Sequence, residues 1–233
     1  MKKIRIPAEL LFLAGNLLLS LAVSTLSAVN FGLSQIVAPA YILHQKLGVI
    51  TFGQGEYILQ AVLFVVFCLI MKRVRLLYLG SFVTCLFYGL VLDGWRAAVP
   101  FFNPAVTPPG SMDWPVRVVL FVFGVLLTTF SVALLFHTYL YPQVYDFFVK
   151  GLSRRFKQPL GRMKSVFDLC MLTLATAMTL LFFGKFVGVS FGTLIMAAVN
   201  GPLIGWWNKW MVAHIESVPL FPRLAARFER ELD

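Results

Sequence analysis

Two carboxylates, Glu56 and Asp168, are the residues of this sequence whose type and position best suit chemistry inside a membrane. Glu56 precedes a charge-free run of 15 residues, 57–71, and Asp168 precedes one of 16 residues, 169–184. An ionisable side chain at membrane depth is costly to bury, so it usually serves an ion, a proton or a substrate. The alternative is that each carboxylate lies in the first turn of its helix and complements the helix dipole. Both interpretations stay open from the sequence.

Uncharged polar residues on other apolar stretches add to this candidate site. Asn16 shares one helical face with Ser20, Ser24 and Ser27, at spacings of 4, 4 and 3 residues. A stripe of serines is typical of helix packing in membranes, whereas the asparagine is the better candidate for lining a cavity. We therefore predict a ligand-binding set that consists of Asn16, Glu56, Gln60, Asp168, Thr193 and Asn200.

No motif for metal, cofactor or covalent chemistry accompanies these residues in the sequence. The cysteines at positions 68, 85 and 170 stand singly on apolar stretches, and neither His44 nor His137 has a second ligand at metal spacing. The sequence contains no phosphate-binding, dinucleotide-binding or nucleophile-elbow pattern. We expect no catalytic residue, no metal, no cofactor and no enzymatic activity.

The elements that must position the candidate site are membrane helices, so we expect an all-α integral membrane protein. Apolar residues make up 59% of the 233 residues, charged residues only 13%, and the mean hydropathy is +0.83. A soluble domain holds about 25% charged residues, so this composition excludes a cytosolic enzyme and a secreted disulfide scaffold. Spans of roughly 20 apolar residues are predicted at Leu10–Val29, Gly55–Met71, Leu76–Trp95, Val118–His137, Ser165–Gly184 and Phe191–Met211.

Lysine and arginine positions fix the predicted orientation of these six spans. With a cytoplasmic N-terminus, 16 of the 20 basic residues fall in cytoplasmic segments and 4 fall outside. We therefore expect a multi-pass protein of the bacterial inner membrane with both termini in the cytoplasm. The net charge of +10 does not predict a nucleic-acid partner, because the basic residues stand in short clusters between apolar runs.

The connecting segments have features of their own. Pro39 can open a short helix, Pro39–Lys46, in the outer interface, and Pro142 can open a second one that runs to Phe156 and faces lipid headgroups. The 96–117 segment holds five prolines and is predicted to be a loop. The tail, Pro219–Asp233, is predicted to be a short amphipathic cytoplasmic helix.

The chain also repeats its own pattern at a fixed offset. Adding 112 takes Gly80 to Gly192, Gly89 to Gly201, Trp95 to Trp207 and Glu56 to Asp168, and adding 109 takes Gly15 to Gly124. We infer one membrane domain, 1–233, with two three-helix halves at about 8–97 and 117–212 and a tail at 213–233. An odd number of spans makes the halves inverted repeats, which are common in secondary transporters. We expect Gly80, Gly89, Gly192 and Gly201 to permit close helix crossing.

Several short motifs support a comparison with a known group of proteins. They are Ala38-Pro39 with Ala40-Tyr41-Ile42-Leu43, Phe52-Gly53-Gln54-Gly55, and Gly188-Val189-Ser190-Phe191-Gly192-Thr193 with Asn200-Gly201-Pro202. On these motifs the chain resembles the YczE/YyaS/YitT group of bacterial integral membrane proteins, over about 10–212. Ala40-Tyr41 stands where that group often has Trp-Asp. The resemblance implies a membrane protein with a transport-related role and carries over no settled activity.

The predicted function is that of a small bacterial inner-membrane transporter or permease for a small polar solute. One alternative is a non-transporting membrane scaffold or regulatory partner, which predicts an apolar bundle without a polar cavity. Another is a substrate-capturing subunit of a larger transporter, which predicts a docking groove. The expected partners are the lipid bilayer and the solute, a second copy of the chain or a partner subunit is a further option, and no nucleic acid is expected.

Overall fold

A computed structural model of the protein describes residues 3–72, 79–140, 143–222 and 225–226. Eight α-helices, one short 3-10 helix and two four-residue strands occur in these ranges. In chain order they are β1 (Ile4–Pro7), α1 (Ala8–Val29), α2 (Ala38–Leu47), α3 (Phe52–Met71), α4 (Leu79–Ala98), η2 (Pro100–Phe102), α5 (Trp114–Phe136), α6 (Val144–Arg155), α7 (Leu160–Phe183), α8 (Phe191–His214) and β2 (Ile215–Val218).

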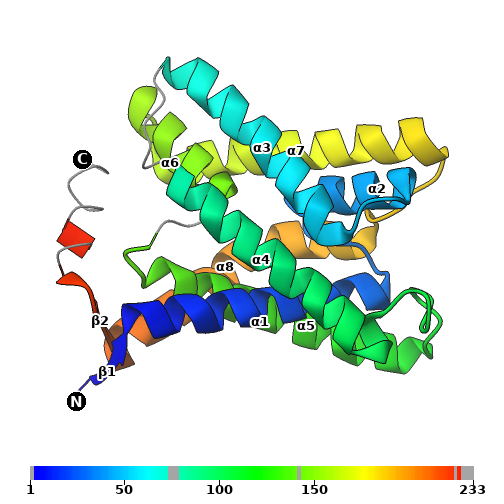
Figure 1. The fold of residues 1–233 in the computed structure, drawn as a ribbon, viewed down its shortest axis with the longest axis horizontal. Helices are drawn as coiled ribbons and strands as arrows, with labels where there is room; N and C mark the ends of the chain where they lie inside the picture. The colour runs from blue at the N-terminus through cyan, green and yellow to red at the C-terminus, as the bar shows by residue number, and fades with distance from the viewer. Residues whose placement is uncertain (1–2, 73–78, 141–142, 223–224, 227–233) are drawn as a thin grey trace.

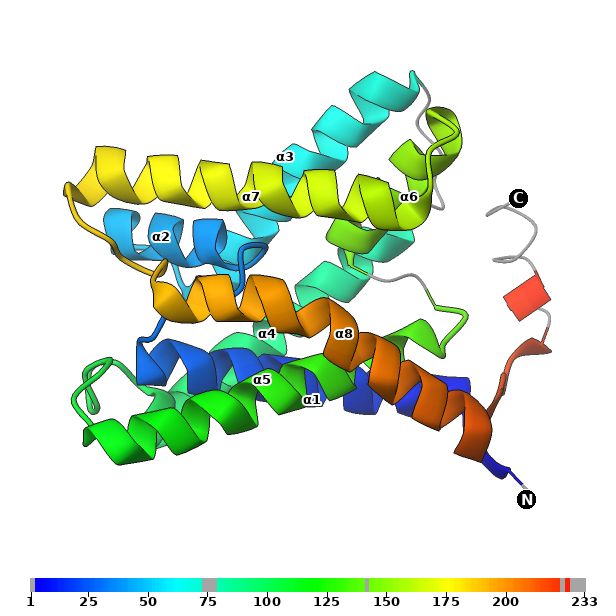
Figure 2. The same cartoon turned by 180° about the vertical axis from the view of Figure 1, so that it is seen from behind.

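Helices α1 and α5 lie along one edge of the molecule and α7 lies along the opposite edge, while α3 and α4 run obliquely across it (Figures 1 and 2). Helices α1 and α5 run side by side along one edge, and α8 packs on α5. Helix α4 crosses α1 and packs on α3. Helix α7 forms the opposite edge, where α2 and α6 each contact both α3 and α7. The two short helices are therefore part of the bundle rather than surface attachments.

Four described helices are long and apolar enough to cross a membrane. They are α1, α3, α5 and the 161–183 part of α7. The chain is thus a helical membrane protein. Helices α4 and α8 are 20 and 24 residues long, but they are more polar, since α4 carries Asp93 and Arg96 and α8 carries Asn208 and Lys209. The predicted third and sixth spans therefore correspond to real helices that composition alone does not mark as membrane-spanning. The start predicted for the third, at Leu76, lies outside the described residues.

The second and fifth spans begin earlier than their apolar runs suggest. Helix α3 begins at Phe52 because the Thr51 side chain accepts from the Gln54 N–H while Gln54 bonds back to Thr51, which is a capping box. Helix α7 begins at Leu160, directly after Pro159, and its first two turns carry basic residues. The capping box sets the start of α3, whereas α7 starts after Pro159 without a side-chain cap, and both helices are longer than their charge-free runs.

A small strand pair was not expected from the sequence. Strand β1 pairs in parallel with β2, with Ile4 opposite Ile215 and Pro7 opposite Val218. The pair joins the start of α1 to the end of α8, which brings the two ends of the membrane domain together (Figure 1). The fold is therefore all-α except for this clasp. The tail helix predicted at Pro219–Asp233 falls mostly outside the described residues, as does the start predicted at Pro142 for the connecting helix.

The contact between α1 and α5 has a reciprocal arrangement. A Cβ built on Gly15 of α1 would lie 2.8 Å from a methyl carbon of Leu135, and one built on Gly124 of α5 would lie 2.8 Å from a methyl carbon of Leu26. Each glycine thus accommodates a leucine of the other helix. The glycines and the leucines are both 109 residues apart, the same offset that relates these two helices in the sequence.

Candidate functional site

Glu56 lies on α3, and its side chain is fully buried. It is the fifth residue of the helix, and the first turn of α3 holds no acid. One of its carboxylate oxygens, Oε2, accepts hydrogen bonds from Gln60 Nε2 at 3.1 Å and from the Tyr145 hydroxyl at 2.8 Å. The alternative of an exposed first-turn acid that complements the helix dipole is therefore wrong for Glu56. The carboxylate faces α6 inside the bundle instead.

Gln60 connects Glu56 to the start of α6. Its Oε1 accepts the Val144 N–H at 3.1 Å, and its Nε2 also lies 3.4 Å from Oε1 of Gln143. The first N–H groups of a helix have no partner within the helix, so a side-chain acceptor there stabilises the helix start. One glutamine on α3 thus holds both the buried acid and the first turn of α6.

Tyr145 approaches the acid from α6. Burial raises the pKa of Tyr145 well above its ordinary value, and the nearby Glu56 carboxylate raises it further. The hydroxyl therefore keeps its proton and remains a hydrogen-bond donor at any physiological pH. This contact gives Glu56 a neutral donor rather than a cation.

The residues around Glu56, namely Gln60, Tyr88, Gln143 and Tyr145, form with it what we call the Glu56 cluster. Some polar atoms of this cluster lack hydrogen-bond partners. Glu56 Oε1, the Tyr88 hydroxyl and Gln143 Nε2 are buried and have no hydrogen-bond partner in the described structure. Tyr88 belongs to α4 and lies close enough to Glu56 to interact with its charge. No lysine, arginine or histidine nitrogen of the described residues lies within 4.0 Å of the carboxylate. A buried acid in this setting must bind a proton, a cation or a polar ligand.

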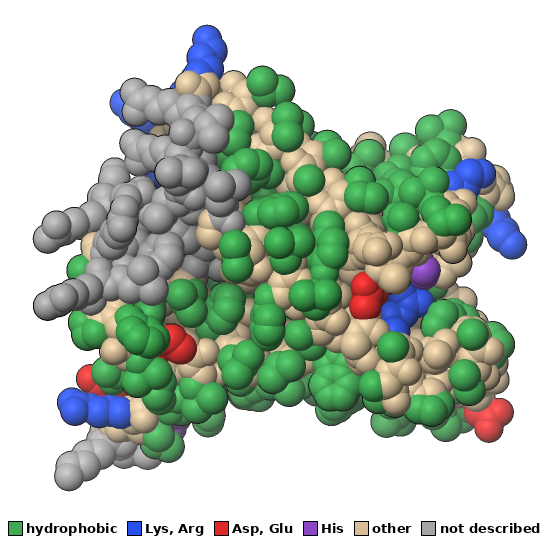
Figure 3. Space-filling model, viewed as in Figure 1, with side chains coloured by type: hydrophobic (Ala, Val, Ile, Leu, Met, Phe, Trp, Pro, Cys, Tyr) green, Lys and Arg blue, Asp and Glu red, His purple; other side chains and the backbone are tan. Residues whose placement is uncertain are grey.

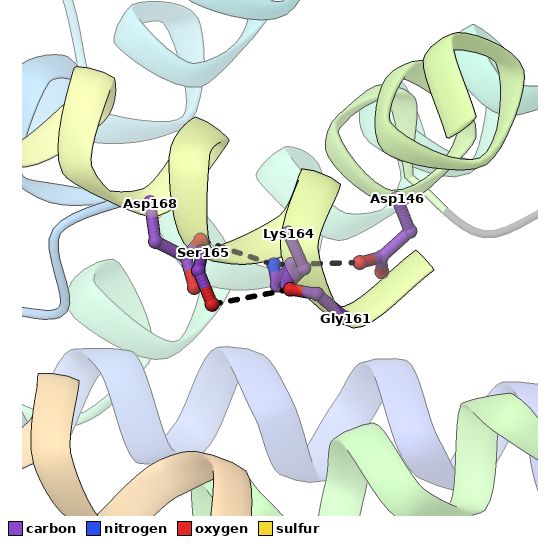
Figure 4. A network of polar contacts seen from close by, with 5 residues as sticks. All are labelled: Asp146, Gly161, Lys164, Ser165 and Asp168. Carbon is purple, nitrogen blue, oxygen red and sulfur yellow. Dashed lines mark hydrogen bonds and ion pairs between the residues drawn. The ribbon is translucent and has the colours of Figure 1, made fainter. Parts of the chain in front are cut away.

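Asp168 forms a different kind of cluster at the start of α7. Lys164, one turn earlier, lies 3.3 Å from the Asp168 carboxylate and 3.8 Å from that of Asp146 on α6. Figure 4 shows the lysine between the two acids, with Ser165 bonded to the Gly161 carbonyl beside it. These three charged side chains are between 26% and 35% exposed. Asp168 is the ninth residue of α7, so it is not a first-turn acid either, and its charge is balanced by a lysine.

The other predicted ligand-binding residues do not join the Glu56 cluster. Asn16 is buried on α1 and donates to the Phe12 carbonyl of its own helix. Thr193 accepts from the Ser190 N–H and completes the cap of α8. Asn200 lies half-buried on α8, and its Oδ1 has no described partner. Of the six predicted residues the structure brings together only Glu56 and Gln60.

The sequence did not predict that Gln143 and Tyr145 belong to the candidate site. They lie in a segment that was expected to face lipid headgroups, yet both are buried. A polar residue directly before a short connecting helix, as Gln143 is before α6, is the sequence feature that could have indicated them. Gln35 lies three residues before α2, where it is buried near the Asp168 carboxylate. In each half, a glutamine ahead of the short helix thus lies near the acidic cluster of the other half.

The four glycines predicted to permit helix crossing behave differently. At Gly89, a Cβ would overlap the Tyr57 ring of α3, and at Gly192 it would overlap the Phe31 carbonyl. Gly201 has open space where a Cβ would lie, so no helix crosses there. Gly80 lies half-buried in the first turn of α4, where its carbonyl accepts from the hydroxyl of the threonine at position 84.

A comparison with known families matches residues 6–209 to a family described as "Family of unknown function (DUF6198)". The chain belongs to the DUF6198 family. No curated protein and no solved structure gave a match. The DUF6198 match includes the Glu56 and Asp168 clusters and seven of the eight α-helices in full, so the geometry described above belongs to the family region of the chain.

Proposed function

We propose that this DUF6198 protein is a small membrane transporter and that a small polar solute binds at the Glu56 cluster. The proposal is carried by one observation, a fully buried carboxylate inside a membrane-length helix that is held by Gln60 and Tyr145. A purely structural bundle gains nothing from burying an acid, because removing it from water is costly. The unpartnered atoms of Glu56, Tyr88 and Gln143 are donors and acceptors that a polar solute would satisfy.

We further propose that the fold comprises six membrane spans arranged as two inverted repeats, with α4 and α8 as the third and sixth. The order of long, short, long and long helices occurs twice, in α1–α4 and α5–α8. Helix α2 packs on α7 and α6 packs on α3, while α1 packs on α4 and α5 on α8. The reciprocal glycine–leucine contacts between α1 and α5 also support this arrangement. Kinship with the YczE/YyaS/YitT group, which implies a transport-related role, is part of the same proposal.

One asymmetry between the halves supports transport over a static scaffold. Helix α3 packs along α4, whereas α7 and α8 are not among the described helix pairs that pack along each other. In Figure 2, α2 lies between α7 and α8. Inverted-repeat transporters work by exchanging two such arrangements between their halves, so that the central site opens first to one side and then to the other. The present packing corresponds to one of the two states.

The proposed location is the bacterial inner membrane with both termini in the cytoplasm. The β1–β2 pair supports a shared side for the two ends, because Ile4 and Ile215 lie opposite each other in the ladder. The cytoplasmic side follows from the excess of lysine and arginine in the segments that would share it.

Solute uptake into proteoliposomes tests the proposed function. The purified protein is first screened for thermal stabilisation by small amino acids, sugars, organic acids and amines, and stabilising solutes are then used in uptake assays. We expect the parent protein to take up at least one solute. The Glu56→Gln variant should lose at least 90% of that uptake, which corresponds to a fall in rate of about tenfold.

The matched control is Asp113→Asn, which removes a carboxylate from an exposed position before α5. This variant should transport at the parental rate. A parent protein that takes up none of the stabilising solutes, or a Glu56→Gln variant that transports like the parent, would contradict the proposal.

A further inference from the structure

A second polar cluster lies at the end of the bundle opposite the strand pair, where α2, α3 and α4 meet. It contains His44 at the end of α2, Phe52 at the start of α3, and Asp93 and Arg96 near the end of α4. In Figure 3, acidic, basic and histidine side chains meet in a recess at the right of the molecule, between larger apolar areas. Nothing in the proposed transport site involves these residues.

Arg96 is the unusual member of this cluster. Its side chain is only 8% exposed, and its Nε is buried without a hydrogen-bond partner. The guanidinium carbon lies 5.3 Å from the centre of the Phe52 ring, and Nη2 lies 3.4 Å from His44 Nε2. No carboxylate oxygen of the described residues lies within 4.0 Å of the guanidinium. A buried cation without a direct counter-charge is costly.

The nearest acid, Asp93, is engaged elsewhere. Its Oδ2 accepts from the Thr51 hydroxyl at 2.5 Å and its Oδ1 accepts from the Gly53 N–H at 2.9 Å. These bonds hold the start of α3, where an acid also complements the helix dipole. Asp93 interacts with Arg96 through space but makes no ion pair with it. The buried Nε–H of the guanidinium is thus left for another acceptor.

His44 cannot supply a negative charge, and its hydrogen bonds fix it as an acceptor toward Arg96. Nδ1 lies 2.6 Å from the Ile50 carbonyl oxygen, which can only accept, so Nδ1 carries the proton. The lone pair of Nε2 therefore points toward Arg96 Nη2. The imidazole is uncharged in this arrangement, and Arg96 keeps its full positive charge.

We propose that this recess binds an oxyanion, a phosphate or carboxylate group, through the Arg96 guanidinium. A guanidinium presents parallel N–H donors that match the oxygens of either group, and such charge-assisted pairs are strong when they are shielded from water. The Phe52 ring beneath the guanidinium leaves its edge to the ligand. The phosphate can belong to a free solute or to a lipid headgroup.

Anion binding to the purified protein in a neutral detergent tests this site. Sodium phosphate and sodium acetate are titrated at constant ionic strength, with sodium chloride as the reference, and the unfolding midpoint and the heat of binding are measured. We expect phosphate or acetate to raise the midpoint and to bind measurably, and chloride to do neither. Absence of any response specific to phosphate or acetate would overturn the proposal.

Arg117 provides the matched control. It also lies over a phenylalanine ring, that of Phe31 at 4.3 Å, but it already donates to the Val29 carbonyl at 2.9 Å. We expect Arg96→Gln to abolish the anion response and Arg117→Gln to keep it. The proposal is overturned if Arg96→Gln responds like the parent.

A second variant keeps the test decisive if Arg96→Gln does not fold. Arg96→Lys retains the charge but has a single ammonium group, so it should bind phosphate at least tenfold more weakly. Equal affinity in Arg96→Lys would overturn the role of the guanidinium. Parallel titrations with free phosphate and with short-chain phosphatidylglycerol separate the two sources of the phosphate group. The one that binds more tightly is assigned as the source, and either result supports the site. Solute uptake does not enter this experiment, so its outcome is independent of the proposed transport function.

Discussion

The Tyr145 hydroxyl donates a 2.8 Å hydrogen bond to the Glu56 carboxylate across 89 residues of sequence. This contact links α6, a helix of 12 residues, to α3, a membrane-length helix of 20 residues. Glu56 has two side-chain donors, Tyr145 and Gln60, and both are uncharged. The short helix therefore supplies one of the two hydrogen bonds that the buried acid accepts.

Removing the Tyr145 hydroxyl is expected to destabilise the protein. Tyr145→Phe leaves Oε2 of Glu56 with the single donor Gln60, so the free energy of unfolding should fall by about 1–3 kcal/mol. Denaturant unfolding in detergent measures the change. Ser165→Ala is the control, because Ser165 is exposed and bonds a carbonyl of its own helix, and it should stay within about 0.5 kcal/mol of the parent. Equal effects of the two substitutions would contradict this account.

The close approach of α3 and α4 predicts opposite effects for two glycines. A Cβ on Gly53 would overlap the Gly89 carbonyl oxygen, so Gly53→Ala should destabilise the protein by about 1–3 kcal/mol. Gly94, on the exposed side of α4, has nothing within 4 Å of a Cβ. Gly94→Ala should therefore raise stability by about 0.5–1 kcal/mol through helix propensity. Thermal unfolding midpoints of the two variants decide the prediction, which fails if Gly53→Ala is the more stable of the two.

The ion pairs of Lys164 are expected to stabilise the packing of α6 on α7, by an amount that falls as the salt concentration rises. Lys164→Gln leaves Asp146 and Asp168 without their shared cation, and the free energy of unfolding should fall by about 0.5–1 kcal/mol because all three side chains are partly exposed to water. The difference in unfolding free energy from the parent should shrink as salt screens the charges. A difference that does not change between low and high salt would show that the ion pairs contribute nothing.

His44 should make stability depend on pH. Burial is the main cause that lowers the pKa of His44 below 6.5, and the Arg96 charge lowers it further, against the Ile50 hydrogen bond and the Asp93 charge, which raise it. The unfolded chain then binds the proton more readily than the folded protein does. Stability from this group is complete above pH 6.5 and is lost as pH falls through the lower folded value.

Comparison with His44→Gln isolates that effect from other acids. Between about pH 7.5 and 5.5, the parent should lose more of its unfolding free energy than the variant does. Identical losses in the two proteins would show that His44 takes up its proton equally well in the folded and unfolded states.

The orientation of the chain can be tested by cysteine labelling in whole cells. In a background without the three native cysteines, Ala105→Cys lies in the proline-rich loop and Arg155→Cys at the end of α6. The charge bias predicts that an impermeant maleimide labels position 105 from outside and reaches position 155 only after the membrane is opened. Labelling of position 155 in intact cells would reject the proposed topology.

The sequence by itself determined that the chain is a helical membrane protein and where its long helices lie. Runs of about 20 apolar residues are sufficient for that, because lipid forces the backbone to satisfy its hydrogen bonds within helices. The sequence also singled out Glu56, because it borders a charge-free run, and Gln60 as one of the polar residues of the candidate site. Helix starts were less accurate because they depend on caps such as Thr51 with Gln54, which apolarity does not register.

Only the tertiary structure decided which polar residues meet. Tyr145 and Gln143 lie more than 80 residues from Glu56 and Gln60, and their segment looks like an interfacial helix until it is seen packed on α3. Asn16, Thr193 and Asn200 have equally suitable side chains, but they lie on other helices, where Asn16 and Thr193 bond within their own helix or its cap. Arg96 likewise becomes a candidate binding residue only in the folded structure. Its burial without a counter-charge is a property of the packing around it and not of its place in the sequence.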